Sequence, residues 1–256
     1  MKTQHFLLPL LFLFTLNSCF NHFTEFGNKV LEEEVREIPY FTSITSTGNF
    51  HVFFEYSDTT EVEVVAESNL IGYIETAVFN ENLKISTPSF VNIRPNYTIE
   101  VYVKGPYLDN IKLTGSGKIE TVPIDALQLD IAITGSGNVF TDFYGTDLTM
   151  KITGSGDIDI YAENEYTNAV ITGSGNIIAE GVTTESDYKI TGSGDIKAYS
   201  YYSDITHIIT TGSGNSYVYV NEELQTTISG SGNVYYKGSP YVSSIITGSG
   251  RVINRN

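Results

Sequence analysis

The sequence predicts an all-β protein, a single-stranded parallel β-helix (β-solenoid) with coils of about 19 residues. The tetrapeptide Thr-Gly-Ser-Gly, once as Ser-Gly-Ser-Gly, recurs eight times, and its first glycine returns after 20, 19, 19, 19, 20, 18 and 18 residues. Glycine, tyrosine and β-branched residues are abundant, and such residues favour strands and tight corners over helices. We call each tetrapeptide a mark; the marks are residues 114–117, 134–137, 153–156, 172–175, 191–194, 211–214, 229–232 and 247–250.

The columns around the marks predict short strands that face a core. In seven of the eight repeats an apolar residue stands directly before the mark, and an apolar β-branched residue stands two positions after it. A polar or charged residue, most often Asn or Asp, follows the second glycine, where it suits a corner because it tolerates left-handed backbone. The residues before the mark are Leu113, Ile133, Ile152, Ile171, Ile190, Thr210, Ile228 and Ile246.

A period of 18 to 20 residues fits one coil of a solenoid but is too short for a helix pair or a propeller blade. Consecutive coils stack as parallel strands about 4.8 Å apart, so seven steps give a rod of roughly 34 Å. Equivalent serines, such as Ser116 and Ser136, should then form a ladder along the rod. A residue between the marks, such as Ser203, is expected in a loop where substitution is nearly neutral.

The first residues predict an exported lipoprotein. Lys2 precedes an apolar run over residues 6–16 that is too short to span a bilayer, and Leu-Asn-Ser-Cys at residues 16–19 is similar to a lipobox. Cys19 is the only cysteine, so we expect it to carry the lipid after removal of a signal peptide of residues 1–18. Residues 19–37 show no strand alternation and are expected to form a partly disordered tether.

Residues 38–110 predict an irregular β region continuous with the solenoid of residues 111–256. Alternating segments such as residues 61–65 and 97–103 are typical of strands. Residues 44–50 (Ile-Thr-Ser-Thr-Gly-Asn-Phe) echo residues 133–139 and predict a degenerate first coil. We expect the region to cover one end of the stack, because an open parallel edge invites other chains to pair with it.

These features together resemble the family of putative autotransporter adhesins with a head GIN domain. The features are an Ile-x-x-x-Gly-x-Phe-x-Val opening at residues 44–52, Val-x-Val-x-Ala at 62–66, Leu-Lys-Ile-Ser at 83–86, Val-Tyr-Val before a proline at 101–106, and the serial Gly-Ser-Gly-Asn/Asp marks. The resemblance covers about residues 41–256. It implies a right-handed coil and an adhesive role on the bacterial envelope, and it supplies no catalytic residues.

Charge and residue types narrow the possible functions. The formal net charge of −16 opposes binding to phosphate backbones, so no nucleic-acid partner is expected. The marks are followed by strands and not by helices, which argues against phosphate loops. The column after the second glycine has acids only at Asp157 and Asp195, too few for calcium, so neither a metal nor another cofactor is expected.

We expect an envelope binding or adhesion module without catalysis, anchored to the outer membrane. A carbohydrate-active enzyme, either a polysaccharide lyase or a glycosidase, is the alternative, because Asp157 and Asp159 lie about 6.5 Å apart along one strand face. No basic residue stands beside them to complete such a site. A purely structural envelope scaffold is the second alternative.

An aromatic strip is the candidate binding site. The fifth and seventh positions after the first glycine should point outward, and near the C-terminus they hold Tyr199, Tyr217, Tyr219 and Tyr235. The spacing puts Tyr217 with Tyr235 in one column and Tyr199 with Tyr219 in another. Stacked rings on a flat face can hold a glycan or a protein partner, although such ladders also stabilise sheets without binding anything.

Overall fold

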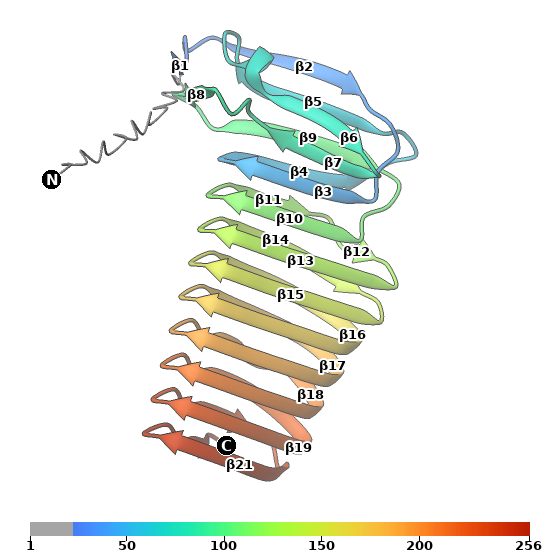
Figure 1. Cartoon of the computed structure of the whole chain (residues 1–256). Coiled ribbons are helices and arrows are strands. Elements are labelled where there is room, and N and C mark those ends of the chain that lie inside the picture. The colour runs from blue at the N-terminus through green and yellow to red at the C-terminus, as the bar shows by residue number, and fades with distance from the viewer. Residues whose placement is uncertain (1–22) are drawn as a thin grey trace, which may run out of the picture.

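The computed structural model describes residues 23–256, and in this part of the chain it confirms the β-solenoid (Figure 1). Residues 1–22 lie outside it, so the expected signal peptide and Cys19 are not part of the described structure. Within residues 23–256, no helix has the length and apolarity needed to cross a membrane. The one helical element is a short 3-10 turn, η1 (Ile71–Tyr73), among the described residues.

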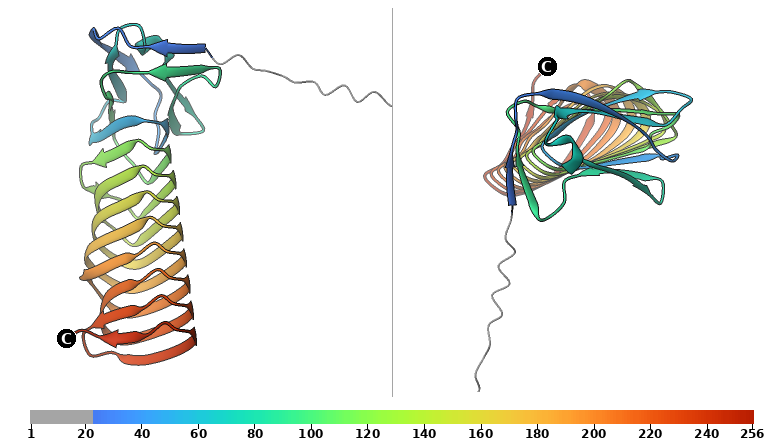
Figure 2. Two further views of the ribbon diagram at one scale, coloured as in Figure 1. Left: turned by 90° about the vertical axis from the view of Figure 1, so that its left-hand side faces the viewer. Right: turned by 90° about the horizontal axis from the view of Figure 1, so that it is seen from above.

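Each coil contains a strand before the mark and a strand after it, and both stack in parallel on the same strands of the next coil (Figures 1 and 2). In the central coils, the strand after one mark runs without a break into the strand before the next. The solenoid strands are β3 (Ser43–Gly48), β4 (Phe50–Tyr56), β10 (Asn110–Gly115), β11 (Lys118–Thr121), β12 (Ile124–Asp125), β13 (Gln128–Gly135), β14 (Asn138–Tyr144), β15 (Asp147–Gly154), β16 (Asp157–Gly173), β17 (Asn176–Gly192), β18 (Ile196–Gly212), β19 (Ser216–Gly230), β20 (Val234–Lys237), β21 (Tyr241–Gly248) and β22 (Val252–Asn254).

The first glycines of successive coils are aligned in register from Gly48 to Gly248. Gly48 pairs with Gly115, which confirms the degenerate first coil predicted at residues 44–50. Eight steps of strand spacing give the stack a length of about 38 Å. The corners at the marks line one edge of the rod (Figure 1).

The corner is built on backbone geometry that only glycine provides. Gly173 has φ +129°, and a Cβ added there would lie 2.2 Å from the carbonyl oxygen of Gly154 in the preceding coil. That oxygen accepts hydrogen bonds from the backbone N–H groups of Ser174, at 2.8 Å, and of Gly175, at 3.2 Å. The first glycine is therefore required both for its conformation and for the close approach of the coils.

The side-chain ladder does not follow the serines of the marks. No hydrogen bond joins their hydroxyl groups in the described residues, and the ladder runs through the residue after the second glycine instead. Asp157 Oδ1 accepts hydrogen bonds from the backbone N–H and the side-chain amide of Asn176, both at 2.8 Å. The serine side chains of the marks are exposed to solvent, whereas the Asn and Asp side chains after the second glycine accept hydrogen bonds from the backbone N–H of the next coil.

The interior confirms the predicted core columns and adds polar residues. The residue before each mark is at most 1% exposed through Ile228, whereas Ile246 in the last coil is 41% exposed. Ser203, expected in a loop, is buried within β18, and its hydroxyl group is hydrogen-bonded to Thr206 at 2.5 Å. It lies in the core because β18 continues through this turn of the coil without a loop, so that alternate side chains still point inward.

A cap covers the end of the rod opposite the C-terminus (Figure 2). The cap elements are β1 (Phe23–Phe26), β2 (Leu31–Glu37), β5 (Glu61–Glu67), η1, β6 (Glu75–Phe79), β7 (Asn82–Ser86), β8 (Val91–Arg94) and β9 (Ile99–Gly105). β7 stacks in parallel on β3, and β9 stacks in parallel on β4. β6, β5 and β2 then add antiparallel strands.

The expectation of a tether over residues 19–37 is wrong for its described part. Residues 23–26 form β1, which pairs with β8, and residues 31–37 form β2, which pairs with β5. The sequence of β2 shows no alternation because it is an edge strand whose side chains are largely exposed on both sides, and charges are common on such edges.

Glu67, buried in the cap, holds the segment between β1 and β2 in place. Its carboxylate accepts hydrogen bonds from the backbone N–H groups of Lys29 and Asn96, both at 2.7 Å, and from the Asn96 side chain at 2.8 Å. Burial alone would raise the pKa of Glu67, but these hydrogen bonds outweigh it and hold the pKa below its usual value.

Candidate functional site: an aromatic face on the C-terminal coils

The candidate site lies on the strands that follow the marks in the last coils, on β18, β19 and β20. We define the tyrosine face as Tyr199, Tyr202, Tyr217, Tyr219 and Tyr235. Tyr217 pairs with Tyr235 in register, as the spacing predicted, and their rings are stacked with centroids 5.0 Å apart and an interplanar angle of 13°. The two rings form a continuous aromatic surface across adjacent coils.

Tyr199 does not share a column with Tyr219, contrary to the prediction from their spacing. The register between β18 and β19 shifts after Ala198, so that Tyr202 pairs with Tyr219. Tyr199 lies in the resulting bulge, and its ring meets the ring of Tyr217 edge to face at 5.6 Å. Tyr202 meets Tyr219 in the same manner at 4.7 Å.

The bulge exists because Tyr201 turns into the core. Its side chain is 1% exposed, and its hydroxyl group is hydrogen-bonded to Thr167 at 2.7 Å and to Asn164. Inserting this ring displaces the neighbouring residues outward, which brings Tyr199 and Tyr202 to the surface. The sequence carries a signal for this shift, because a coil of 20 residues is followed here by one of 18.

None of the tyrosines of this face is buried, and the four predicted ones lie on one side of the rod. Cations flank them: Lys237 Nζ lies 4.8 Å from the ring centroid of Tyr199, and Arg255 Cζ lies 5.2 Å from that of Tyr235. Desolvation by partial burial raises the pKa of Tyr199 and of Tyr217, so both phenols are neutral at physiological pH.

A shallow hollow opens beside the stacked rings. Its volume is about 330 Å³, and its walls include the rings of Tyr199 and Tyr217 and the side chain of Lys197. Lys197 pairs in register with Tyr217, so a lysine borders the stacked rings on the preceding coil. The arrangement offers flat apolar surfaces with positive charge at the rim, a combination suited to sugar rings that carry hydroxyl or carboxylate groups.

The column that contains Tyr217 and Tyr235 also has an aromatic stack at the cap end of the rod. Phe53 on β4 and Tyr102 on β9 pair in register, and their rings are stacked at 5.0 Å with an interplanar angle of 11°. The sequence could not reveal this pair, because the two strands lie far apart along the chain. Its neighbourhood is acidic, since the Tyr102 hydroxyl group donates to Glu100 at 2.8 Å.

The carboxylates considered for an enzyme do not form an acid–base pair. Asp157 is already the acceptor of the two hydrogen bonds from Asn176 described above. Asp159 is exposed and pairs in register with Ile178 on the next coil. Among the described residues neither Asp157 nor Asp159 forms an ion pair.

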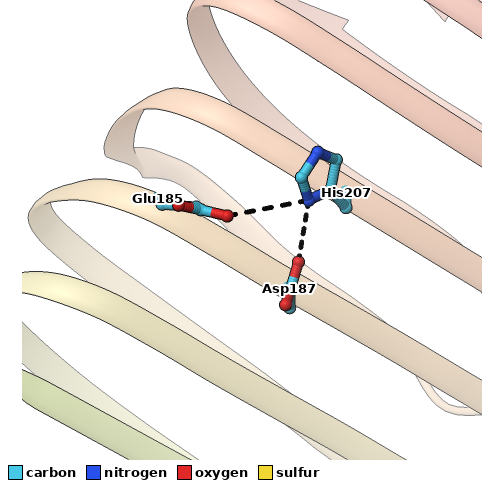
Figure 3. Close-up of side chains that lie close together, drawn as sticks. All are labelled: Glu185, Asp187 and His207. Atoms are coloured by element: carbon cyan, nitrogen blue, oxygen red, sulfur yellow. Dashed lines mark hydrogen bonds and ion pairs between the residues drawn. The ribbon is translucent and has the colours of Figure 1, made fainter.

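A second cluster, not predicted from the sequence, brings together Glu185, Asp187 and His207 (Figure 3). His207 Nδ1 lies 2.9 Å from Asp187 Oδ1 and 3.9 Å from Glu185 Oε1. The Tyr166 hydroxyl group donates to the other oxygen of Asp187 at 2.6 Å, and this hydrogen bond raises the pKa of Tyr166 to about 12. The signal was present, because Asp187 and His207 are 20 residues apart, the length of one coil.

The comparisons with known proteins agree with the fold. The family model described as "Putative auto-transporter adhesin, head GIN domain" matches residues 40–240. No curated protein matches the chain.

Several solved structures are similar over nearly the whole chain. A putative lipid binding protein from Parabacteroides distasonis has a TM-score of 0.86 at 24% identity, covering 91% of this chain and 100% of its own. A putative adhesin from Parabacteroides merdae has a TM-score of 0.86 at 23% identity, covering 91% of this chain and 99% of its own. A putative adhesin from Bacteroides fragilis has a TM-score of 0.67 at 20% identity, covering 90% and 100%. At these identities the likeness shows the fold, and the family model shows the membership: the chain belongs to the family of putative auto-transporter adhesins with a head GIN domain.

Proposed function

We propose that the protein is a non-catalytic binding or adhesion module of the bacterial envelope, held by a lipid on Cys19, whose tyrosine face contacts a glycan or a protein. Family membership supports the adhesive role. The observation that carries the proposed site is the partly exposed stack of Tyr217 on Tyr235, with Arg255 over the Tyr235 ring and Lys237 over the neighbouring Tyr199 ring. These rings present apolar surface to solvent instead of packing in the core, as is typical of a contact surface for a partner.

Replacing Tyr217 and Tyr235 together by alanine should weaken ligand binding by roughly 5- to 140-fold, because two stacked rings at about 0.5–1.5 kcal/mol each contribute about 1–3 kcal/mol. The melting temperature should change little, since the rings are partly exposed. A glycan array first selects a glycan that the unchanged protein binds, and titration calorimetry then measures the affinity of the variant for it.

The matched control is the double replacement of Phe53 and Tyr102, whose rings are stacked at the same distance in the same column at the cap end. This variant should keep its affinity. If both variants lose stability equally and neither loses binding, the rings only support the sheet and the proposed site is refuted.

The lipid anchor rests on the lipobox-like residues 16–19 and on Cys19 as the only cysteine. β1 begins at Phe23, close to Cys19 in the sequence, and it belongs to the cap. An anchor at Cys19 would therefore hold the cap near the membrane. The tyrosine face would lie at the far end of a rod of about 38 Å, where it can reach a partner.

Replacing Cys19 by serine should abolish acylation, because the thioether bond to the lipid needs the thiol group of this residue. Incorporation of a labelled fatty acid in cells, followed by detergent phase partition, measures the effect. The control is Ser18→Ala, which keeps a small residue before the cysteine and should be acylated normally. Unchanged acylation of the Cys19→Ser variant would remove the anchor from the proposal.

A carbohydrate-active enzyme is the competing proposal, and it depends on Asp157 and Asp159. It requires that the protein degrades a polysaccharide and that Asp159→Asn abolishes this turnover. The binding module requires instead that the selected glycan is recovered intact after incubation with the protein.

A further inference from the structure

We propose that Glu185, Asp187 and His207 form a binding site for a divalent transition-metal ion such as Zn²⁺ (Figure 3). The site lies on the strands before the marks, on β17 and β18, and shares no residue with the tyrosine face. The two proposals can therefore fail separately.

The coil register brings the three ligands together. Glu185 and Asp187 are two residues apart on β17, so their side chains point to the same side of the sheet. His207 pairs with Asp187 in register on the next coil, which puts the imidazole directly beside the carboxylate. The side chains remain 36–44% exposed, so an ion can enter from solvent and keep open positions for water or an external ligand.

The distances suit a metal ion at the centre of the cluster. One oxygen or nitrogen atom from each of the three side chains lies within 4.8 Å of the others. Bonds of about 2.0–2.2 Å to a tetrahedral ion separate ligand atoms by roughly 3.5 Å. The observed separations of 2.9 and 3.9 Å from His207 Nδ1 lie on either side of this value, so small side-chain rotations complete the geometry.

Tyr166 on the preceding coil completes the arrangement as a positioning residue. Its hydroxyl group donates to Asp187 Oδ2, which leaves Oδ1 as the free ligand atom facing His207. Hydrogen bonds of this kind to ligating carboxylates orient the ligand and raise metal affinity. Three successive coils thus contribute to one site.

The donor set decides the class of metal. One imidazole and two carboxylates are typical ligands for zinc and its first-row neighbours. Calcium and magnesium prefer sites built from oxygen alone. The two carboxylates together also balance the charge of a divalent ion, whereas a His–Asp hydrogen bond alone would involve only one of them.

The other described histidine paired with a carboxylate lacks these features and is the matched control. His51 Nε2 lies 2.9 Å from Glu120 Oε1, but Lys118 forms an ion pair with the same carboxylate. The lysine ammonium group already supplies the positive charge there, and no second carboxylate is grouped with His51. A metal ion at that position would find a single carboxylate, Glu120, which is already paired with Lys118.

The test is titration calorimetry of the purified protein with ZnCl₂, combined with the visible absorption of bound Co²⁺. We expect one ion per chain. His207→Ala and Asp187→Asn should abolish binding, Tyr166→Phe should weaken it by about tenfold, and His51→Ala should leave it unchanged.

Circular dichroism of each variant separates loss of the site from loss of the fold, and Glu185→Gln provides a second, conservative variant should His207→Ala be unstable. The proposal is overturned if the unchanged protein takes up no Zn²⁺. It is also overturned if Zn²⁺ binds with the same affinity to folded His207→Ala and Glu185→Gln.

Discussion

Gly173→Ala should lower the free energy of unfolding by about 3 kcal/mol, although it adds a single methyl group. The backbone at Gly173 has φ +129°, which an L-residue rarely adopts, and the new Cβ would lie 2.2 Å from the carbonyl oxygen of Gly154. That oxygen belongs to the backbone of the preceding coil and accepts hydrogen bonds from the N–H groups of Ser174 and Gly175, so it cannot move without disturbing the corner. Urea denaturation followed by circular dichroism measures the change.

Gly72→Ala is the matched control, since the same methyl group is added to a glycine with open space around it. No heavy atom lies within 4 Å of a Cβ at Gly72, and its φ lies outside the range that disfavours L-residues. This variant should be neutral or slightly more stable, because alanine reduces the entropy of the unfolded chain. Equal destabilisation of the two variants would contradict the assignment of the marks as structural corners.

Ile171→Ala should cost about 2–5 kcal/mol, the range for a large-to-small replacement in a packed core. Ile171 is fully buried before the mark of a central coil, between the equivalent isoleucines of its two neighbours. Ile246 occupies the same column in the last coil and is 41% exposed, so Ile246→Ala should cost about 1 kcal/mol or less. Urea denaturation of both variants gives the comparison.

The difference between the two isoleucines tests how the solenoid is stabilised. If each coil buries its apolar residues against the next, a position with a neighbour on only one side loses part of its burial. Similar losses for the two variants would contradict this mode of stabilisation.

The sequence by itself determined the coil and its register. The spacing of the marks identifies which residues stack, and Gly154, Gly173 and Gly192 pair in the structure as the repeat requires. This succeeded because each corner is a local device: a glycine with positive φ and an apolar residue on either side recur whenever the chain completes one turn. The stack of Tyr217 on Tyr235 follows from the same rule.

Only the tertiary structure decided where the repeat is broken. β3 and β4 form a coil whose upper neighbours, β7 and β9, come later in the chain, so the order in space differs from the order in sequence. β2 becomes a strand only through pairing with β5, since its exposed side chains show no alternation. Such pairings depend on contacts between distant segments, which local patterns do not encode.

The same limit explains the differences at the candidate sites. Tyr201 enters the core because Asn164 and Thr167 offer hydrogen bonds to its hydroxyl group from an earlier coil, and this single rotation moves Tyr199 out of the column of Tyr219. The cluster of Glu185, Asp187 and His207 likewise arises where successive coils meet. Spacing determines which residues are stacked where the register is regular, as at Tyr217 and Tyr235. Where the register shifts, as between β18 and β19, the packing of side chains between coils decides the pairing.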